Sequence, residues 1–356
     1  MVTLQVGKTV WDQAPRQMRV ELWMSSLQRR GVGVAAAAKY EDMLLTPVSD
    51  EAVNDIEKDI ARTFPATRRF TTAEGQQALR RVLHAYAAYD PEVGYCQGMN
   101  FVAGLLLMYL PERHAFGGLV VLMQDRGLRR YYSTDMSLLQ THLWQLGRLI
   151  PPRLNAHLES HGVLPLLYGA SWLMTCFSAD FPASFSARVM DVILHGWMMD
   201  QALLKAAVAV LVRLEGRLLA SNEMEDCLAL LKSEAPSWED AVLHDVLTEA
   251  FGKPWTAQQL LLLSSVEGGA SSSSSRRGTR GEDGIPTVAA PAGIRQQQQQ
   301  QQLGLGLGQP VYRQQSLGGM PVAGRGQQQQ HGLGQSVYRQ QSLGSMPESG
   351  SEAAPL

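Results

Sequence analysis

Residues 94–111 read GYCQGMNFVAGLLLMYLP, a short polar stretch followed by an apolar run that stops at a proline. The first five residues are small or polar and predict a turn. The segment from Met99 to Leu110 carries no charged residue, so we expect a helix that is buried on all sides. The most apolar part, residues 101–110, is about half of the ~20 residues that a membrane-spanning helix needs. The segment therefore predicts a core helix of a globular protein.

The rest of residues 14–267 has the same helical character. Apolar residues recur at three- and four-residue spacing and strand signals are nearly absent, which predicts an all-α fold. One amphipathic helix carries Val53, Ile56 and Ile60 on one face. We expect Ser49 or Asp50 to cap its start and the helix to end before Pro65. Further helices are expected within residues 35–38, 73–89, 138–149, 155–161, 165–177, 185–195 and 201–220.

The composition divides the 356 residues into three parts. All 7 Trp and all 3 Cys precede residue 268, whereas the long Gln runs follow it. A segment without bulky apolar groups cannot offset its chain entropy, so residues 268–356 are expected to be a disordered, Gln/Gly/Ser-rich tail. Residues 1–13 are then a short lead-in, and residues 14–267 form one folded body.

The formal net charge of −2 and the cysteine usage exclude several classes of protein. Nucleic-acid binding depends on clustered Lys and Arg, so no nucleic-acid partner is expected. Cys96, Cys176 and Cys227 are too scattered for a disulfide framework or a thiolate zinc site, and the histidines show no metal-ligand spacing. No signal peptide is apparent. We expect a cytoplasmic protein without a metal site, whose association with membranes is peripheral.

The tail contains a duplicated unit, VYRQQSLG, at residues 311–318 and 337–344. Each copy places an arginine three residues before a serine, Ser316 or Ser342, a spacing that some kinases prefer. Two phosphoserines on one flexible segment would suit a dimeric phosphoserine reader, because bivalent binding raises the effective concentration. Unmodified low-complexity sequence is the alternative interpretation.

Two polar positions are candidates for chemistry. Asp59 and Arg62 are three residues apart near a predicted helix end, so they share a face and can hold one another. Gln97 has both a hydrogen-bond donor and an acceptor and precedes the buried helix. Taken singly, Arg62 also suits a surface ion pair and Gln97 a helix-entry cap. Cys96 suits a small core residue better than a nucleophile.

The sequence contains, in this order, Arg19-Val-Glu-Leu-Trp23, Ile56-x-x-Asp59-x-x-Arg62 followed by Thr-Phe-Pro65, and Gly94-Tyr-Cys-Gln-Gly98-Met-Asn100. These three segments resemble the signature motifs of the TBC domain, the common catalytic domain of Rab GTPase-activating proteins. The resemblance extends over about residues 14–230, with further agreement at 90–92, 172–177, 181–182 and at Arg188-x-x-Asp191.

The resemblance implies a V-shaped, two-lobed helical domain that accelerates GTP hydrolysis by a GTP-bound Rab-family small GTPase. Arg62 and Gln97 would be the catalytic arginine and glutamine, supplied from outside the GTPase, with Asp59, Tyr95 and Gly98 supporting them. We expect Arg68, Arg69 and Asn100 as candidate partner contacts. The motif residues expected to serve structure are Arg19, Trp23, Ile56 and Asp191.

A protein of this kind is an enzyme activator in vesicle trafficking rather than an enzyme that hydrolyses GTP alone. It needs no cofactor of its own, because Mg²⁺ and GTP belong to the GTPase. The resemblance places it at endomembranes only through a bound Rab. The alternative is a non-catalytic TBC scaffold that binds a Rab or another protein without stimulating hydrolysis. The presence of both Arg62 and Gln97 weighs against that alternative.

Overall fold

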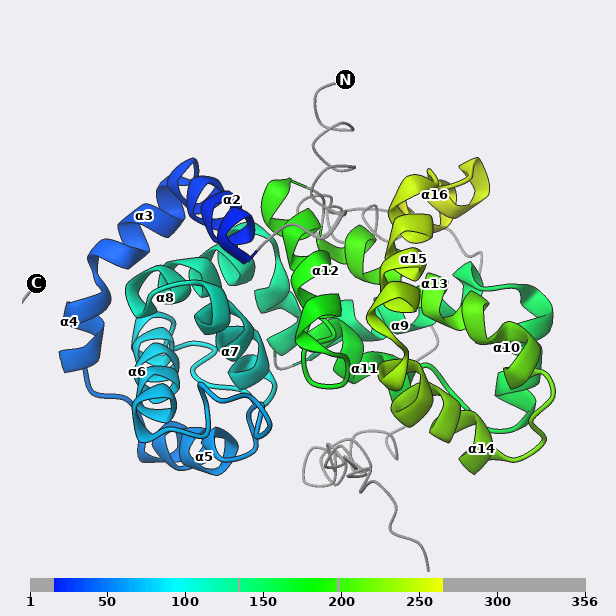
Figure 1. Cartoon of the computed structure of the whole chain (residues 1–356), viewed down its shortest axis with the longest axis horizontal. Coiled ribbons are helices and arrows are strands. Elements are labelled where there is room, and N and C mark those ends of the chain that lie inside the picture. The colour runs from blue at the N-terminus through cyan, green and yellow to red at the C-terminus, as the bar shows by residue number, and fades with distance from the viewer. Residues whose placement is uncertain (1–15, 134, 197–198, 265–356) are drawn as a thin grey trace, which may run out of the picture. The chain divides into compact units, whose positions relative to one another are not determined.

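The computed structural model of this chain describes residues 16–133, 135–196 and 199–264. Every regular element within these ranges is a helix, and none is a strand, which confirms the predicted all-α class (Figure 1). None of these helices is long and apolar enough to cross a membrane. The predictions for the lead-in 1–13, the tail 268–356, Ser316 and Ser342 lie outside the described residues.

The first group of helices extends to residue 132 and runs from blue to green-cyan in Figure 1. Its last two elements depart from α geometry: η1 is a single π-helical turn and η2 is a short 3-10 helix. The bounds are α2 Arg16–Gln28, α3 Gly31–Ala38, α4 Tyr40–Leu45, α5 Asp50–Ile60, α6 Ala73–Tyr89, α7 Met99–Tyr109, α8 Glu112–Val120, η1 Val121–Asp125 and η2 Leu128–Tyr132.

The second group is green to yellow in Figure 1 and begins with α9. It packs against the first group where α12 contacts α2 and α7, and where α9 and α11 contact η2. The bounds are α9 Ser137–Leu149, α10 Pro152–Ser160, α11 Leu166–Met174, α12 Ala183–His195, α13 Met199–Leu218, α14 Met224–Ala229, η3 Leu230–Glu234, η4 Ala235–Ser237, α15 Asp240–Gly252 and α16 Ala257–Ser264.

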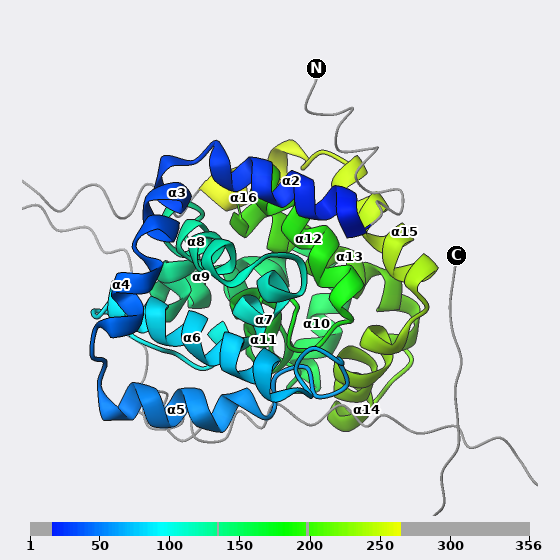
Figure 2. The ribbon, with the colours of Figure 1, turned by 60° about the vertical axis from the view of Figure 1, so that its left-hand side comes forward.

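Helix α7 is the buried core helix that the sequence predicts, and Figure 2 shows it among the helices of the first group. Its residues from Met99 to Leu107 are all buried, because α5, α6, α8, α2 and α12 pack around it. Gly104 provides the space for one of these contacts. A Cβ there would lie 2.8 Å from the Phe64 ring, so only glycine lets the 61–72 loop pack this closely on α7.

Helix α5 begins as expected, since the Ser49 hydroxyl accepts a hydrogen bond from the Ala52 amide at 3.2 Å. Its buried face differs from the prediction. Ile56 and Ile60 are buried, but Val53 is 39% exposed and lies at the edge of that face. Ala52 and Asp59 complete the buried side instead. A buried carboxylate on an otherwise apolar face requires partners, and those partners form the candidate site described below.

The three remaining structural motif residues join α2 to α12. Arg19 donates through Nε to both carboxylate oxygens of Asp191 at 3.0 Å, and Trp23 Nε1 donates to Oδ1 at 2.7 Å. Burial raises the pKa of Asp191 to about 6, although Arg19 and Trp23 pull it down. Trp23 and Ile56 are 1% and 2% exposed. Trp23 and Ile56 therefore lie in the core, and Arg19 and Trp23 join α2 to α12 through Asp191.

Candidate functional site

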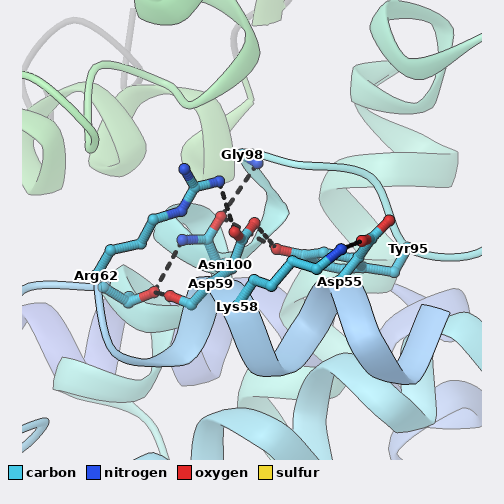
Figure 3. A network of polar contacts seen from close by, with 8 residues as sticks. Asp55, Lys58, Asp59, Arg62, Tyr95, Gly98 and Asn100 are labelled. Atoms are coloured by element: carbon cyan, nitrogen blue, oxygen red, sulfur yellow. Dashed lines mark hydrogen bonds and ion pairs between the residues drawn. The ribbon is translucent and has the colours of Figure 1, made fainter. Parts of the chain in front are cut away.

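Arg62 lies just beyond the C-terminal end of α5, in the turn that leads into the 61–72 loop. Its guanidinium donates through Nη2 to Asp59 Oδ1 at 2.5 Å (Figure 3). The Arg62 side chain keeps 35% of its surface exposed, whereas that of Asp59 keeps 6%. The buried carboxylate thus holds one edge of the guanidinium and leaves its other donors unpaired within the described residues.

The Tyr95 hydroxyl forms a hydrogen bond with the second oxygen of the same carboxylate. It donates to Asp59 Oδ2 at 2.5 Å and lies 3.3 Å from Asn100 Oδ1 (Figure 3). A phenol has one hydroxyl hydrogen, so the shorter contact to Asp59 receives it. Asp59 therefore connects the end of α5 to the turn at 94–98.

Asn100 connects the same two segments one step deeper in the protein. Its Oδ1 accepts from the Gly98 amide at 3.1 Å, and its Nδ2 donates to Thr63 Oγ1 at 2.8 Å. Thr63 Oγ1 in turn donates to the Asp59 carbonyl at 2.7 Å. Asn100 is fully buried, although the sequence had suggested a partner contact at this position. A side chain placed in this way supports the turn rather than a surface.

Gln97 extends from this turn, and its position follows from the glycine after it. Gly98 has φ +105°, in a region that other residues rarely adopt, and caps the start of α7. A Cβ at Gly98 would lie 3.3 Å from the Thr175 methyl group. Gln97 is half-buried, and its amide makes no hydrogen bond within the described part of the chain. The turn thus holds a glutamine whose side-chain amide has no hydrogen-bond partner among the described residues.

The electrostatics of the network depend on burial. Burial raises the pKa of Asp59, whereas the hydrogen bond from Tyr95 and the Arg62 charge lower it. Burial also raises the pKa of Tyr95, and the neighbouring carboxylate adds to this effect, so the phenol keeps its proton. Burial raises the pKa of the Cys96 thiol to about 11, so this cysteine is a poor nucleophile, in agreement with the sequence interpretation.

The other candidate contacts lie on the loop that follows Arg62. Arg68 and Arg69 are both exposed, and neither side chain forms an ion pair among the described residues. Arg69 lines a surface cavity of about 380 Å³ together with Arg16 and Tyr109. The described part of the chain holds no cluster of three or more His, Cys, Asp or Glu side chains placed to bind a metal ion.

Sequence reasoning missed Thr63 and the structural role of Asn100. Both belong to the quoted motifs, but their hydrogen bonds join residues 37 positions apart in the chain. The available signal was chemical, since a side-chain amide directly after a glycine turn and inside an apolar helix needs buried partners.

Comparison with known proteins gives a consistent result. The family model described as the Rab-GTPase-TBC domain matches residues 16–219. TBC1 domain family member 4 of Mus musculus is 38% identical over 199 residues, which are 54% of this chain and 15% of that protein. The Rab GTPase-activating protein tbc-11 of Caenorhabditis elegans is 34% identical over 202 residues, 54% of this chain and 21% of that protein. The chain thus spans less than a quarter of either relative.

Among solved structures, the Chlamydomonas flagellar RabGAP TBC domain is similar in fold. It superposes with a TM-score of 0.60 at 24% sequence identity, covering 70% of this chain and 84% of that one. The Ypt/Rab-GAP domain of Gyp1p also gives a TM-score of 0.60, at 20% identity, covering 73% of this chain and 93% of that one.

Proposed function

Because this chain belongs to the Rab-GTPase-TBC domain family, we propose that it accelerates GTP hydrolysis by a GTP-bound Rab-family GTPase. Arg62 and Gln97 act in trans on the γ-phosphate and on the attacking water. The proposal rests on the Asp59 carboxylate. One of its oxygens binds Arg62, and the other binds Tyr95, which lies two residues before Gln97. Arg62 and the turn that carries Gln97 are thereby both bonded to the buried Asp59 carboxylate.

Arg62 provides the positive charge. Phosphoryl transfer spreads negative charge over the γ-phosphate oxygens, and an arginine inserted in trans typically contributes 10³–10⁵ in rate. A guanidinium remains protonated and presents a planar fork of donors, so one edge can stay on Asp59 while the other meets phosphate oxygens. Restraining the side chain before docking lowers the entropy lost on reaching the transition state.

Gln97 orients the water. Its carbonyl oxygen accepts a hydrogen bond from the nucleophile, and its amide nitrogen donates to the γ-phosphate. Because the amide has no partner within the described residues, it needs to break no internal hydrogen bond to do so. In this proposal Gln97 replaces the water-orienting glutamine that Ras-type GTPases supply themselves.

The protein contributes only side chains to the reaction, whereas Mg²⁺ and GTP come with the GTPase. Arg68 and Arg69, on the loop after Arg62, are available to contact acidic side chains of that partner. Recruitment to endomembranes, in a cytoplasmic protein that acts in vesicle trafficking, then follows from binding a membrane-anchored Rab.

Single-turnover GTP hydrolysis across a panel of Rab GTPases tests the proposal. The catalytic reading predicts that at least one Rab is stimulated by several orders of magnitude and that Arg62→Ala removes the stimulation. If this protein binds a GTP-loaded Rab tightly but stimulates hydrolysis by no Rab of the panel, it is instead a non-catalytic scaffold.

A further inference from the structure

The segment that carries Gln97, residues 90–98, is anchored at its first residue as well as at its last. Asp90 is buried, and its carbonyl oxygen accepts from the amides of Val93 and Gly94 at 3.2 and 2.8 Å. Its carboxylate accepts from the Tyr86 hydroxyl at 3.0 Å. The same carboxylate also accepts two hydrogen bonds from Arg129, at 2.7 Å from Nε and 3.0 Å from Nη2. A bidentate pair of this kind fixes orientation as well as distance.

Arg129 comes from η2, and η2 also reaches the far end of the same segment. Tyr132 donates its hydroxyl to the Met174 carbonyl at 2.7 Å. A Cβ added to Gly98 would lie 3.5 Å from this hydroxyl. One five-residue helix therefore bonds to residue 90 and lies beside residue 98, on either side of Gln97.

The 3-10 geometry of η2 explains how one short helix does this. A 3-10 helix has three residues per turn, so side chains at i and i+3 lie on one face. Arg129 and Tyr132 are three apart and face the 90–98 segment. Leu128 and Tyr131, also three apart, are fully buried in the core. The core residues thus fix the rotation of η2 and, with it, the direction in which Arg129 and Tyr132 extend.

From this arrangement we infer that Arg129 is a positioning residue for Gln97, acting through Asp90 and the 90–98 segment. The inference rests on the proposed function, because it assigns Arg129 a role in the same reaction. Arg129 also contacts Glu92 at 2.8 Å, but that carboxylate is 83% exposed, and an exposed pair adds little. The Asp90 carboxylate is 7% exposed, so loss of Arg129 would leave a buried negative charge without its cationic partner.

Two measurements on Arg129→Gln test the inference, with Arg130→Gln as the matched control. Arg130 is the exposed neighbour in η2, and its side chain has no ion pair or hydrogen bond among the described residues. Single-turnover hydrolysis at increasing concentrations of this protein gives a maximal rate and a half-saturating concentration. Amide hydrogen exchange of residues 90–98 reports the order of the segment without any GTPase present.

We expect Arg129→Gln to lower the maximal rate about 10- to 100-fold, since a displacement of about 1 Å has effects of that size. The half-saturating concentration should change less than about threefold. Exchange should become faster within residues 90–98 and remain unchanged elsewhere. In a Gln97→Ala background, Arg129→Gln should cause no further loss of rate, because its effect passes through Gln97.

Equal losses in both backgrounds, or exchange in 90–98 no faster than for Arg130→Gln, would overturn the inference. If Arg129→Gln does not fold, Tyr86→Phe removes one hydrogen bond from the same carboxylate and should give a smaller loss that again requires Gln97. A loss with Tyr86→Phe that persists without Gln97 would also overturn it. If exchange in residues 90–98 is faster in Arg129→Gln but the wild-type protein stimulates no Rab, the proposed function is contradicted, whereas the positioning of the Gln97 segment by Arg129 is not.

Discussion

Arg62 and Tyr95 bind different oxygens of one buried carboxylate, that of Asp59, each at 2.5 Å. The two residues are 33 positions apart in the chain and belong to different segments, the end of α5 and the turn before α7. A movement of either segment is therefore transmitted to the other through the Asp59 side chain, and Asn100 forms a second connection between the same segments. This coupling is the structural reason to treat Arg62 and Gln97 as parts of one site.

Replacing Tyr95 with Phe removes only the hydroxyl that joins the two segments. The Asp59 carboxylate then loses its second partner, and the turn keeps only the connection through Asn100 and Thr63 to the end of α5. We expect the maximal rate of stimulated hydrolysis to fall about tenfold, an effect of about 1.4 kcal/mol. Tyr89→Phe is the control, because the Tyr89 hydroxyl makes no hydrogen bond among the described residues. Equal rates for the two variants would show that the link has no part in catalysis.

Replacing Arg62 with Ala or Lys should lower stimulated hydrolysis by about 10³-fold. The ammonium of Lys cannot keep one edge on Asp59 while bridging phosphate oxygens with another, so Lys should not rescue. The fold and Rab binding should stay largely intact, because the Asp59 carboxylate keeps the hydrogen bond from Tyr95. Arg113→Ala on α8, an exposed arginine paired with Glu41, is the control. An Arg62→Ala protein with near-wild-type activity would remove Arg62 from the mechanism.

Replacing Gly98 with Ala should destabilise the protein by about 1–3 kcal/mol, because alanine is strained at φ +105°. The new Cβ would also press on Thr175. Gly216→Ala is the matched control: this glycine lies within α13, and a Cβ there meets no atom within 4 Å. The control should be neutral or stabilising by up to about 1 kcal/mol. Urea unfolding measures both, and similar midpoints for the two variants would contradict the prediction.

The buried His142 side chain should make the free energy of unfolding depend on pH. It is buried, its Nδ1 lies 2.7 Å from the Tyr131 hydroxyl, and burial lowers its pKa to about 4, although Asp200 opposes the shift. An unfolded histidine titrates near 6.5. Between these values the unfolded chain binds more protons, so this contribution is complete above pH 6.5 and is lost as the pH falls towards 4.

The free energy of unfolding should therefore decrease by up to about 3 kcal/mol between pH 6.5 and 4 through this group. In His142→Gln the decrease should be smaller by that amount, whereas in His161→Gln, a half-buried histidine of the second group, it should persist. Denaturant unfolding at several pH values makes the comparison. An unchanged pH profile in His142→Gln would show that this histidine does not control the stability.

Long amphipathic helices were predictable because their apolar period extends over several turns. The helix at 73–89 was predicted with the bounds that α6 has. The helix expected up to residue 177 ends instead at Met174, since Cys176 and Phe177 have positive φ values of 50° and 67°. Helix α8 was not predicted, as its paired glycines disfavour a helix. Gly117 is required there, because a Cβ would lie 2.7 Å from the Gly33 carbonyl.

The candidate site was predictable where it rests on short motifs, and not where it rests on contacts between distant segments. The roles of Asp59, Arg62 and Gln97 were expected because their motifs resemble those of the TBC domain. The bond from Arg129 to Asp90 joins residues 39 positions apart, and η2 is too short to show a period in its sequence. Such contacts depend on how the core residues rotate each element, which a single sequence does not display.

The central claim is that Gln97 supplies the water-orienting amide in trans, and the GTPase's own glutamine tests it directly. In a Ras-type mechanism that glutamine orients the water, and its removal abolishes stimulated hydrolysis. The measurement is single-turnover hydrolysis by a substrate Rab whose catalytic glutamine is changed to Ala, with wild-type protein and with Gln97→Ala. We predict that the Rab variant still responds to the wild-type protein. Gln97→Ala should lower the rate about 10²-fold or more, which corresponds to an increase of a few kcal/mol in the activation free energy. Loss of response by the Rab variant while the complex still forms, with Gln97→Ala nearly silent, would contradict the claim.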